Sequence, residues 1–173
     1  MRTLIVGTCL AAMCSLAFAA KNPSVTKAYA DGKGIVHIVT ANGRDLTLPP
    51  EKGQEGVDKI QVTPDGKTVG WLVNRWDSCC VSYAIPTELV IWRSGHVIRR
   101  IHPSMAIWSW AFLKNGSELA YRISPLRGGW SGECVLAETA TGKNLAVWDF
   151  PVDQNGNDSG DNSDEPEWAK QIP

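Results

Sequence analysis

The residues that could carry chemistry in this 173-residue chain are few, and none stands in a catalytic motif. Nucleophilic hydrolysis needs a serine or cysteine, a histidine base and an acid that orients the base. The three histidines, His37, His96 and His102, are predicted inside a strand, in a turn and just past a strand end. The run Gly-Trp-Ser-Gly-Glu ends in glutamate where a nucleophile elbow requires glycine. The sequence therefore favours a protein that is not an enzyme. The alternative is a small secreted hydrolase that would use Glu133, His102 or Asp77.

Cysteine offers a second kind of chemistry. Cys79, Cys80 and Cys134 follow an N-terminal segment that we interpret as a signal peptide, and in an oxidising compartment such residues tend to pair. Adjacent cysteines rarely bond to each other, because the small ring strains the peptide between them. We therefore expect Cys134 to pair with Cys79 or Cys80. The spacing does not match a structural zinc site, and the sequence predicts no metal and no cofactor.

Arginine and aromatic residues gather in two long predicted connections, at 74–87 and 124–132. Such side chains on scaffolded loops are typical of recognition surfaces. Because the two connections hold the same place in successive repeat units, we expect them to emerge on one side of the molecule. The alternative is that their tryptophans plug the end of the sheets. The predicted binding residues are Arg75, Trp76, Tyr83, Arg127 and Trp130.

The elements that would position these residues form a repeat. Residues 58–73 and 108–123 align at a fixed offset of 50 residues without a gap. Each copy has two alternating apolar runs around an Asx-Gly turn, which is a strong hairpin signal. The matching apolar positions are Ile60, Val62, Val69, Trp71 and Val73 in the first copy and Trp110, Phe112, Leu119, Tyr121 and Ile123 in the second. A repeat of this length predicts a stacked or radial β architecture.

Three further hairpins are predicted at 35–48, 88–101 and 133–150, with turns at Gly43, Gly95 and Gly142, and a short strand at 25–29. Two hairpins give four antiparallel strands, the content of one propeller blade. The predicted fold is all-β, with antiparallel four-stranded propeller-blade-like sheets in about two and a half units. Closed propellers need at least about four blades. The sheets must then be completed by other copies of the chain or packed face to face in an open, compact monomer, which we favour.

One motif carries a resemblance to known proteins. The run VTPDGKTVGW at 62–71 resembles the S-P-D-G-K-x-[IV]-[AG]-[WF] repeat of TolB-like and WD40-like β-propellers. The likeness covers residues 58–150, although the second copy keeps only Lys114-Asn115-Gly116. Trp148-Asp149 lacks the upstream Gly-His of the WD40 signature. The resemblance implies blade-like hairpins and leaves the function open, because propeller folds host many unrelated activities.

The two ends of the chain differ from its middle. Residues 1–19 resemble a signal peptide, with Arg2, an apolar stretch and the small-x-small site Ala17-Phe18-Ala19. The apolar stretch is shorter than a membrane span requires, so we expect a secreted or periplasmic mature chain without a span. Residues 20–34 form an N-terminal segment and 35–150 the blade-like domain. Residues 151–173 read as an acidic, mostly disordered tail, which Trp168 could anchor near its end.

Charge excludes one class of partner. Residues 20–152 hold 15 lysines and arginines against 12 aspartates and glutamates, without the dense basic patch that nucleic acid requires. The sequence as a whole favours a non-catalytic exported binding module that recognises a protein or a cell-envelope component. A structural remnant of a longer propeller is the remaining alternative.

Overall fold

The computed structural model describes residues 23–76, 82–126, 132–155, 159 and 162–173. Within these residues the chain forms eleven β-strands and two short 3₁₀ helices. The strands make three antiparallel sheets of three, four and four strands, and none of the sheets closes into a barrel. The predicted all-β fold is confirmed.

The strands follow one another in chain order within each sheet. The first sheet contains β1 (Val25–Ala30), β2 (Val36–Thr40) and β3 (Asp45–Leu48). The second contains β4 (Gln54–Val62), β5 (Thr68–Trp76), β6 (Ala84–Arg93) and β7 (His96–Ile101). The third contains β8 (Ala106–Leu113), β9 (Glu118–Ser124), β10 (Glu133–Glu138) and β11 (Asn144–Asp149). The 3₁₀ helices are η1 (Lys114–Gly116), between β8 and β9, and η2 (Ala169–Gln171), near the C-terminus.

The hairpins that the sequence predicts are all present. They correspond to the antiparallel pairs β2–β3, β4–β5, β6–β7, β8–β9 and β10–β11. The predicted strand at 25–29 is β1, which pairs with β2 and so brings part of the 20–34 segment into the first sheet. Alternation predicts these strands well because successive side chains of a strand point to opposite faces of its sheet.

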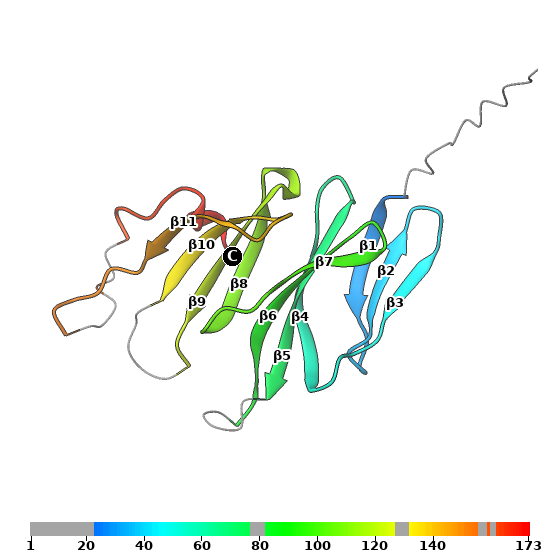
Figure 1. Ribbon diagram of the computed structural model, residues 1–173, viewed down its shortest axis with the longest axis horizontal. Helices are drawn as coiled ribbons and strands as arrows, with labels where there is room; N and C mark the ends of the chain where they lie inside the picture. The colour runs from blue at the N-terminus through cyan, green and yellow to red at the C-terminus, as the bar shows by residue number, and fades with distance from the viewer. Residues whose placement is uncertain (1–22, 77–81, 127–131, 156–158, 160–161) are drawn as a thin grey trace, which may run out of the picture.

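The three sheets lie in a row in chain order (Figure 1). The first interface, between the first and second sheets, is an apolar cluster that includes Val25, Ile38, Val69, Trp71 and Trp92. The second interface, between the second and third sheets, includes Leu72, Ile91, Trp110, Leu119 and Tyr121. The sheets are therefore packed face to face in an open stack, which buries apolar side chains without closing a ring.

The repeat places equivalent residues on equivalent faces. Trp71 of β5 packs toward the first sheet, and its equivalent Tyr121 of β9 packs toward the second sheet. Each copy therefore turns the same side of its hairpin to the sheet that precedes it.

The turn glycines of the two copies also act alike. Gly66 has a φ of 66°, and a Cβ there would lie 2.7 Å from the carbonyl oxygen of Val25 in the first sheet. Gly116 has a φ of 85°, and a Cβ there would lie 2.4 Å from Cγ2 of Thr63, which follows β4. Only glycine combines this backbone conformation with such a close approach. Each Asx-Gly turn thus brings its sheet into contact with the preceding one.

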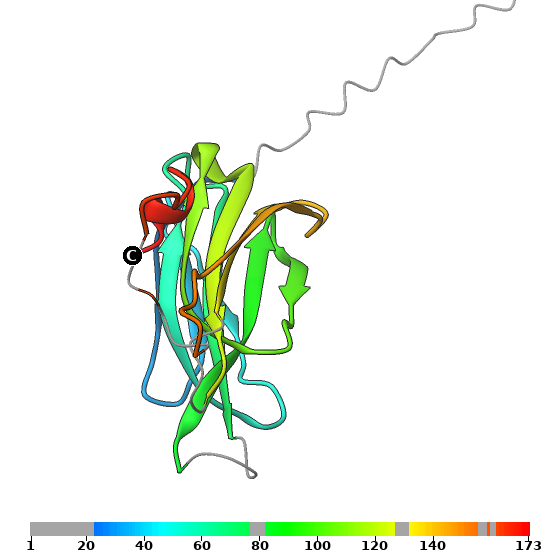
Figure 2. The same ribbon diagram turned by 90° about the vertical axis from the view of Figure 1, so that its left-hand side faces the viewer.

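The C-terminal segment covers the outer face of the third sheet, as the view from that side shows (Figure 2). Ala169 and Ile172 are buried there against Cys134, and Trp168 is partly buried in the same cluster. The described part of residues 151–173 therefore includes a segment that packs on the sheet, with Trp168 in the anchoring cluster.

The outer face of the first sheet is polar instead. The Tyr29 and His37 rings stack with their centroids 4.7 Å apart, and His37 Nδ1 lies 3.0 Å from Asp45 Oδ2. Lys27 Nζ lies 4.6 Å from the centre of the Tyr29 ring. The stack therefore ends in a polar surface on one side and a covered surface on the other.

Candidate functional site

Strands β5 and β6 extend further than the sequence predicts. Part of the expected connection at 74–87 is paired, with Asn74 opposite Pro86 and Trp76 opposite Ala84. Pro86 has no N–H to donate, and a register shift beside Asn74 lets the ladder continue past the proline. Arg75 and Trp76 therefore stand on a strand end, not in a loop.

Arg75 belongs to a group of four charges that we call the charge ring: Glu51, Arg75, Glu88 and Arg100. Arg75 Nη2 lies 2.9 Å from Glu88 Oε2 and 3.1 Å from Glu51 Oε2. Arg100 Nη1 lies 2.6 Å from Glu88 Oε1, and Arg100 also pairs with Glu51. Each arginine thus bridges both glutamates. Glu51 follows β3, so the ring ties the connection between the first two sheets to β5, β6 and β7.

The buried member of the ring is Glu88, whose side chain is 0% exposed. Burial by itself raises the pKa of Glu88, but the hydrogen bonds from Arg100 and Arg75 outweigh it and hold the pKa below its usual value of 4.5. The hydrogen bond to Glu88 raises the pKa of Arg75. Glu88, Arg75 and Arg100 therefore stay charged at neutral pH, and the ring holds two arginines and two glutamates, so its formal charges balance.

Two exposed aromatic side chains stand near the charge ring, at the end of the paired strands β5 and β6. Trp76 ends β5 and is 54% exposed, while Tyr83 comes directly before β6 and is 53% exposed. Of the predicted binding residues, the structure leaves Trp76 and Tyr83 exposed at the same end of the β5–β6 strand pair, and it engages Arg75 with the protein's own acids. Arg127 and Trp130 lie outside the described residues.

Cys134 has no disulfide partner among the residues that the structure describes, and the expected bond to Cys79 or Cys80 stays a prediction. Its side chain is 0% exposed and packs under Ala169 and Ile172 on the outer face of the third sheet. Burial raises the pKa of its thiol. The burial of Cys134 could not be predicted from the sequence, because the residues that cover it, Ala169 and Ile172, come from the far end of the chain. Cys79 and Cys80 lie outside the described residues.

The two described residues of the hydrolase alternative, His102 and Glu133, stand beside different sheets. His102 Nε2 lies 3.4 Å from Glu88 Oε1, an acid that both ring arginines already engage. Glu133 begins β10 in the third sheet, and Asp77 lies outside the described residues. In the part of the chain that the structure describes, no three His, Cys, Asp or Glu side chains gather as a metal site would need. No helix in that part is long and apolar enough to cross a membrane.

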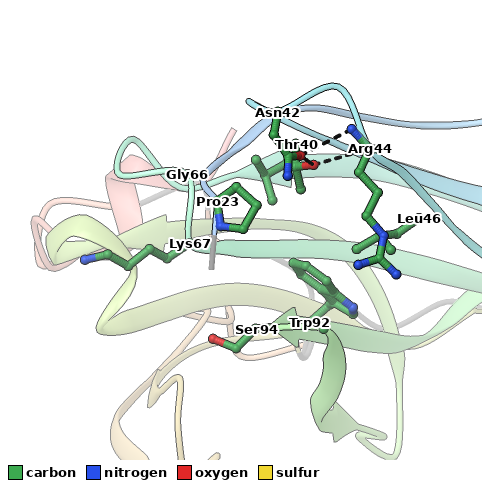
Figure 3. Close-up of a pocket in the computed structure, with 11 residues that line it drawn as sticks. Pro23, Thr40, Asn42, Arg44, Leu46, Gly66, Lys67, Trp92 and Ser94 are labelled. Atoms are coloured by element: carbon green, nitrogen blue, oxygen red, sulfur yellow. Dashed lines mark hydrogen bonds between the residues drawn. The ribbon is translucent and has the colours of Figure 1, made fainter. Parts of the chain in front are cut away.

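A cavity of ≈ 390 Å³ lies at the opposite end of β5, between the first and second sheets (Figure 3). Arg44, Lys67 and Ser94 stand around it, and Trp92 and Leu46 line its apolar part. The sequence analysis singled out none of these side chains for binding. The available signal was the spacing of the turns at Gly43, Gly66 and Gly95, which puts three turns at one end of two neighbouring sheets.

Comparison with known proteins adds no relative. No family model matches this chain, and no curated protein sequence matches it. The resemblance of residues 62–71 to TolB-like and WD40-like repeats therefore stays a prediction from the motif.

Proposed function

We propose that this protein is a non-catalytic exported binding module that recognises a protein or a cell-envelope component. The contact would be made at the end of the paired strands β5 and β6 where Trp76 and Tyr83 stand. The observation that carries the proposal is the exposure of Trp76, at 54%, on the paired end of β5, together with that of Tyr83, at 53%, directly before β6. Large aromatic side chains that lie open on a rigid element are the residue types that dominate binding energy at protein interfaces.

The charge ring supports this role by its neutrality. Arg75 and Arg100 are both paired with Glu51 and Glu88, so the charge ring next to the aromatic residues has no excess charge. It also holds the hairpin to the β3–β4 connection, so the aromatic side chains project from a fixed base. Recognition at this end would then depend on apolar and aromatic contact. The signal-like N-terminus adds the expectation that the partner is met outside the cytoplasm.

The test replaces both aromatic side chains and measures capture of the partner. Purified protein starting at Ala20 is immobilised and exposed to solubilised envelope components, in parallel with Trp76→Ala/Tyr83→Ala. Capture by the double variant should fall at least about tenfold, since two central aromatic contacts contribute more than 1 kcal/mol each. A photoreactive amino acid at position 83 identifies the partner by cross-linking.

A matched control removes exposed apolar area elsewhere. Leu145 and Val147 of β11 are each 49% exposed, and Leu145→Ala/Val147→Ala should leave capture unchanged. Equal melting temperatures for both double variants and the wild type show that the fold is intact. Full capture by the Trp76→Ala/Tyr83→Ala protein would refute the site.

A further inference from the structure

We propose that the cavity between the first and second sheets binds a carboxylate that is joined to an apolar group, with Arg44 as its charge partner. The site lies at the other end of β5 from Trp76, so it is independent of the surface proposed above. Its volume of ≈ 390 Å³ is within the range of about 300–1,000 Å³ that is typical of small-ligand sites.

The charge of the cavity is one-sided. Of the eleven residues that line it, two are cationic and none is acidic. Lys67 already pairs with an acid, because its Nζ lies 3.2 Å from Asp65 Oδ2, and its side chain is 68% exposed. No side chain among the described residues forms an ion pair with Arg44. One positive charge therefore remains available at the cavity.

The backbone that carries Arg44 is held firmly. Thr40 is 4% exposed, and its single hydroxyl proton is shared between two acceptors, Asn42 Oδ1 at 2.7 Å and the Arg44 carbonyl oxygen at 2.9 Å. The Thr40 N–H also donates to the Arg44 carbonyl oxygen at 2.9 Å. These bonds use the backbone of the turn, and no described residue hydrogen-bonds to the guanidinium of Arg44. A ligand thus meets an arginine whose attachment point is already ordered, which lowers the entropy cost of binding.

The apolar side of the cavity stands next to this charge. In Figure 3 the Arg44 side chain reaches down beside Leu46 toward Trp92, and the indole nitrogen of Trp92 lies on the Arg44 side of its ring. The Trp92 indole N–H makes no hydrogen bond with the described residues, so it is a second available donor. Pro23 and Val25 extend the apolar lining.

This combination selects the ligand class. A guanidinium binds a planar carboxylate through two parallel hydrogen bonds, and a single unpaired cation matches a single negative charge. A phosphate dianion would need further free cations, and Lys67 is already paired with Asp65. The Trp92, Leu46 and Pro23 surface favours an apolar group beside the carboxylate. Two sources share this chemistry, a free organic acid and the C-terminus of a peptide with an apolar last residue.

The experiment titrates the ¹⁵N-labelled protein with N-acetyl-leucine and follows the Trp92 indole N–H by NMR, with Trp92→Phe used to assign the signal. N-acetyl-leucinamide has the same shape without the charge, and it should bind at least about tenfold more weakly. Arg44→Gln should remove this difference between acid and amide. A peptide ending in leucine distinguishes the sources: tighter binding than N-acetyl-leucine assigns a peptide terminus, and equal binding assigns a free acid.

Two control variants separate Arg44 from charge in general. Lys143 follows the turn glycine Gly142 as Arg44 follows Gly43, so Lys143→Gln removes one charge at the equivalent turn of the third sheet and should not change binding. Lys67→Gln should reduce binding less than Arg44→Gln. Equal binding of acid and amide by the wild type, or unchanged acid binding by Arg44→Gln, would overturn the proposal. Trp76→Ala/Tyr83→Ala should leave the titration unchanged, so this site and the partner surface can fail separately.

Discussion

The two interfaces between sheets are built from equivalent hairpins, but their turn ends are closed differently. At the second interface Arg93 Nη2 donates to the Gly116 carbonyl oxygen at 3.3 Å, and Arg99 Nη2 donates to the Ala140 carbonyl oxygen at 2.9 Å. At the first interface the turn end holds a cavity, and Arg44 has no ion-pair partner there among the described residues. Arginine thus joins neighbouring sheets at one interface and remains available to a ligand at the other.

The difference extends along the interfaces. The second interface is filled by Trp110, which is 0% exposed and donates from Nε1 to the Lys59 carbonyl oxygen at 3.0 Å. A Cβ on Gly70 would lie 2.4 Å from the Trp110 ring, so the two sheets approach closely there. The first interface is instead tied at its far end by the charge ring around Glu88. The second interface thus depends mainly on the packing of apolar side chains, whereas ion pairs also stabilise the first.

The largest effect is expected from two of the interface tryptophans, Trp110 and Trp92. Trp110→Ala should lower the free energy of unfolding by about 5 kcal/mol, near the upper end for a buried aromatic residue, because Trp110 is 0% exposed and packs closely over Gly70. Trp92→Ala should cost less, about 3 kcal/mol, because water can enter the adjoining cavity. Urea unfolding measures both, with Trp110→Phe and Trp92→Phe as milder variants that should keep this ranking. A larger loss for Trp92→Ala would contradict the contrast in packing.

Removing the buried acid of the charge ring should rank next. Glu88→Ala leaves Arg75 and Arg100 without their shared partner and should lower the free energy of unfolding by about 3 kcal/mol. This is the lower end of the range for a broken buried ion pair, because both arginines keep some contact with water. Urea unfolding checks the value. Glu167→Ala, which breaks an exposed pair with Lys170, is the control and should have no measurable effect.

Arginine substitutions compare the two turn ends directly. Arg93→Gln removes a bond to Thr68 Oγ1 at 2.8 Å and the bond to Gly116, and should lower the free energy of unfolding by about 1–2 kcal/mol. Arg44→Gln should change it by less than about 0.5 kcal/mol, since described residues engage Arg44 through its backbone alone. Urea unfolding measures the midpoint of each variant, and the midpoints are compared when the dependence of the unfolding free energy on urea concentration is unchanged. Equal losses would mean that Arg44 has a structural role like that of Arg93.

The pH dependence should give the smallest effect. Because the folded-state pKa of Glu88 lies below its ordinary value of 4.5, its contribution to stability is present above pH 4.5 and is lost as the pH falls through the folded-state pKa. Wild type and Glu88→Gln should therefore differ most in stability near neutral pH and converge in acid. Chemical unfolding over this range tests the sign. A constant difference would show that the charge of Glu88 does not contribute.

Local patterns predicted the strands and turns well, and side-chain partners poorly. The alternation in 58–73 and 108–123 and the glycines at 66 and 116 depend on neighbours in the sequence, so the hairpins could be foreseen. Arg75 was expected to face a partner because it lies in one of two predicted connections in which arginine and aromatic residues gather. Its two acids, Glu51 and Glu88, come from other elements, and no local pattern connects them to it.

The sequence by itself determined the all-β fold, the hairpins and the repeat, because strand alternation and Asx-Gly turns act over a few residues. The tertiary structure alone decided that the sheets form an open stack, that Cys134 lies beneath the C-terminal segment, and that, among the described residues, Arg75 has ion-pair partners while Arg44 has none. These features depend on which sheet faces which, and that order brings together residues far apart in the chain. The same two-hairpin unit therefore produced a filled interface in one place and a candidate binding cavity in the other.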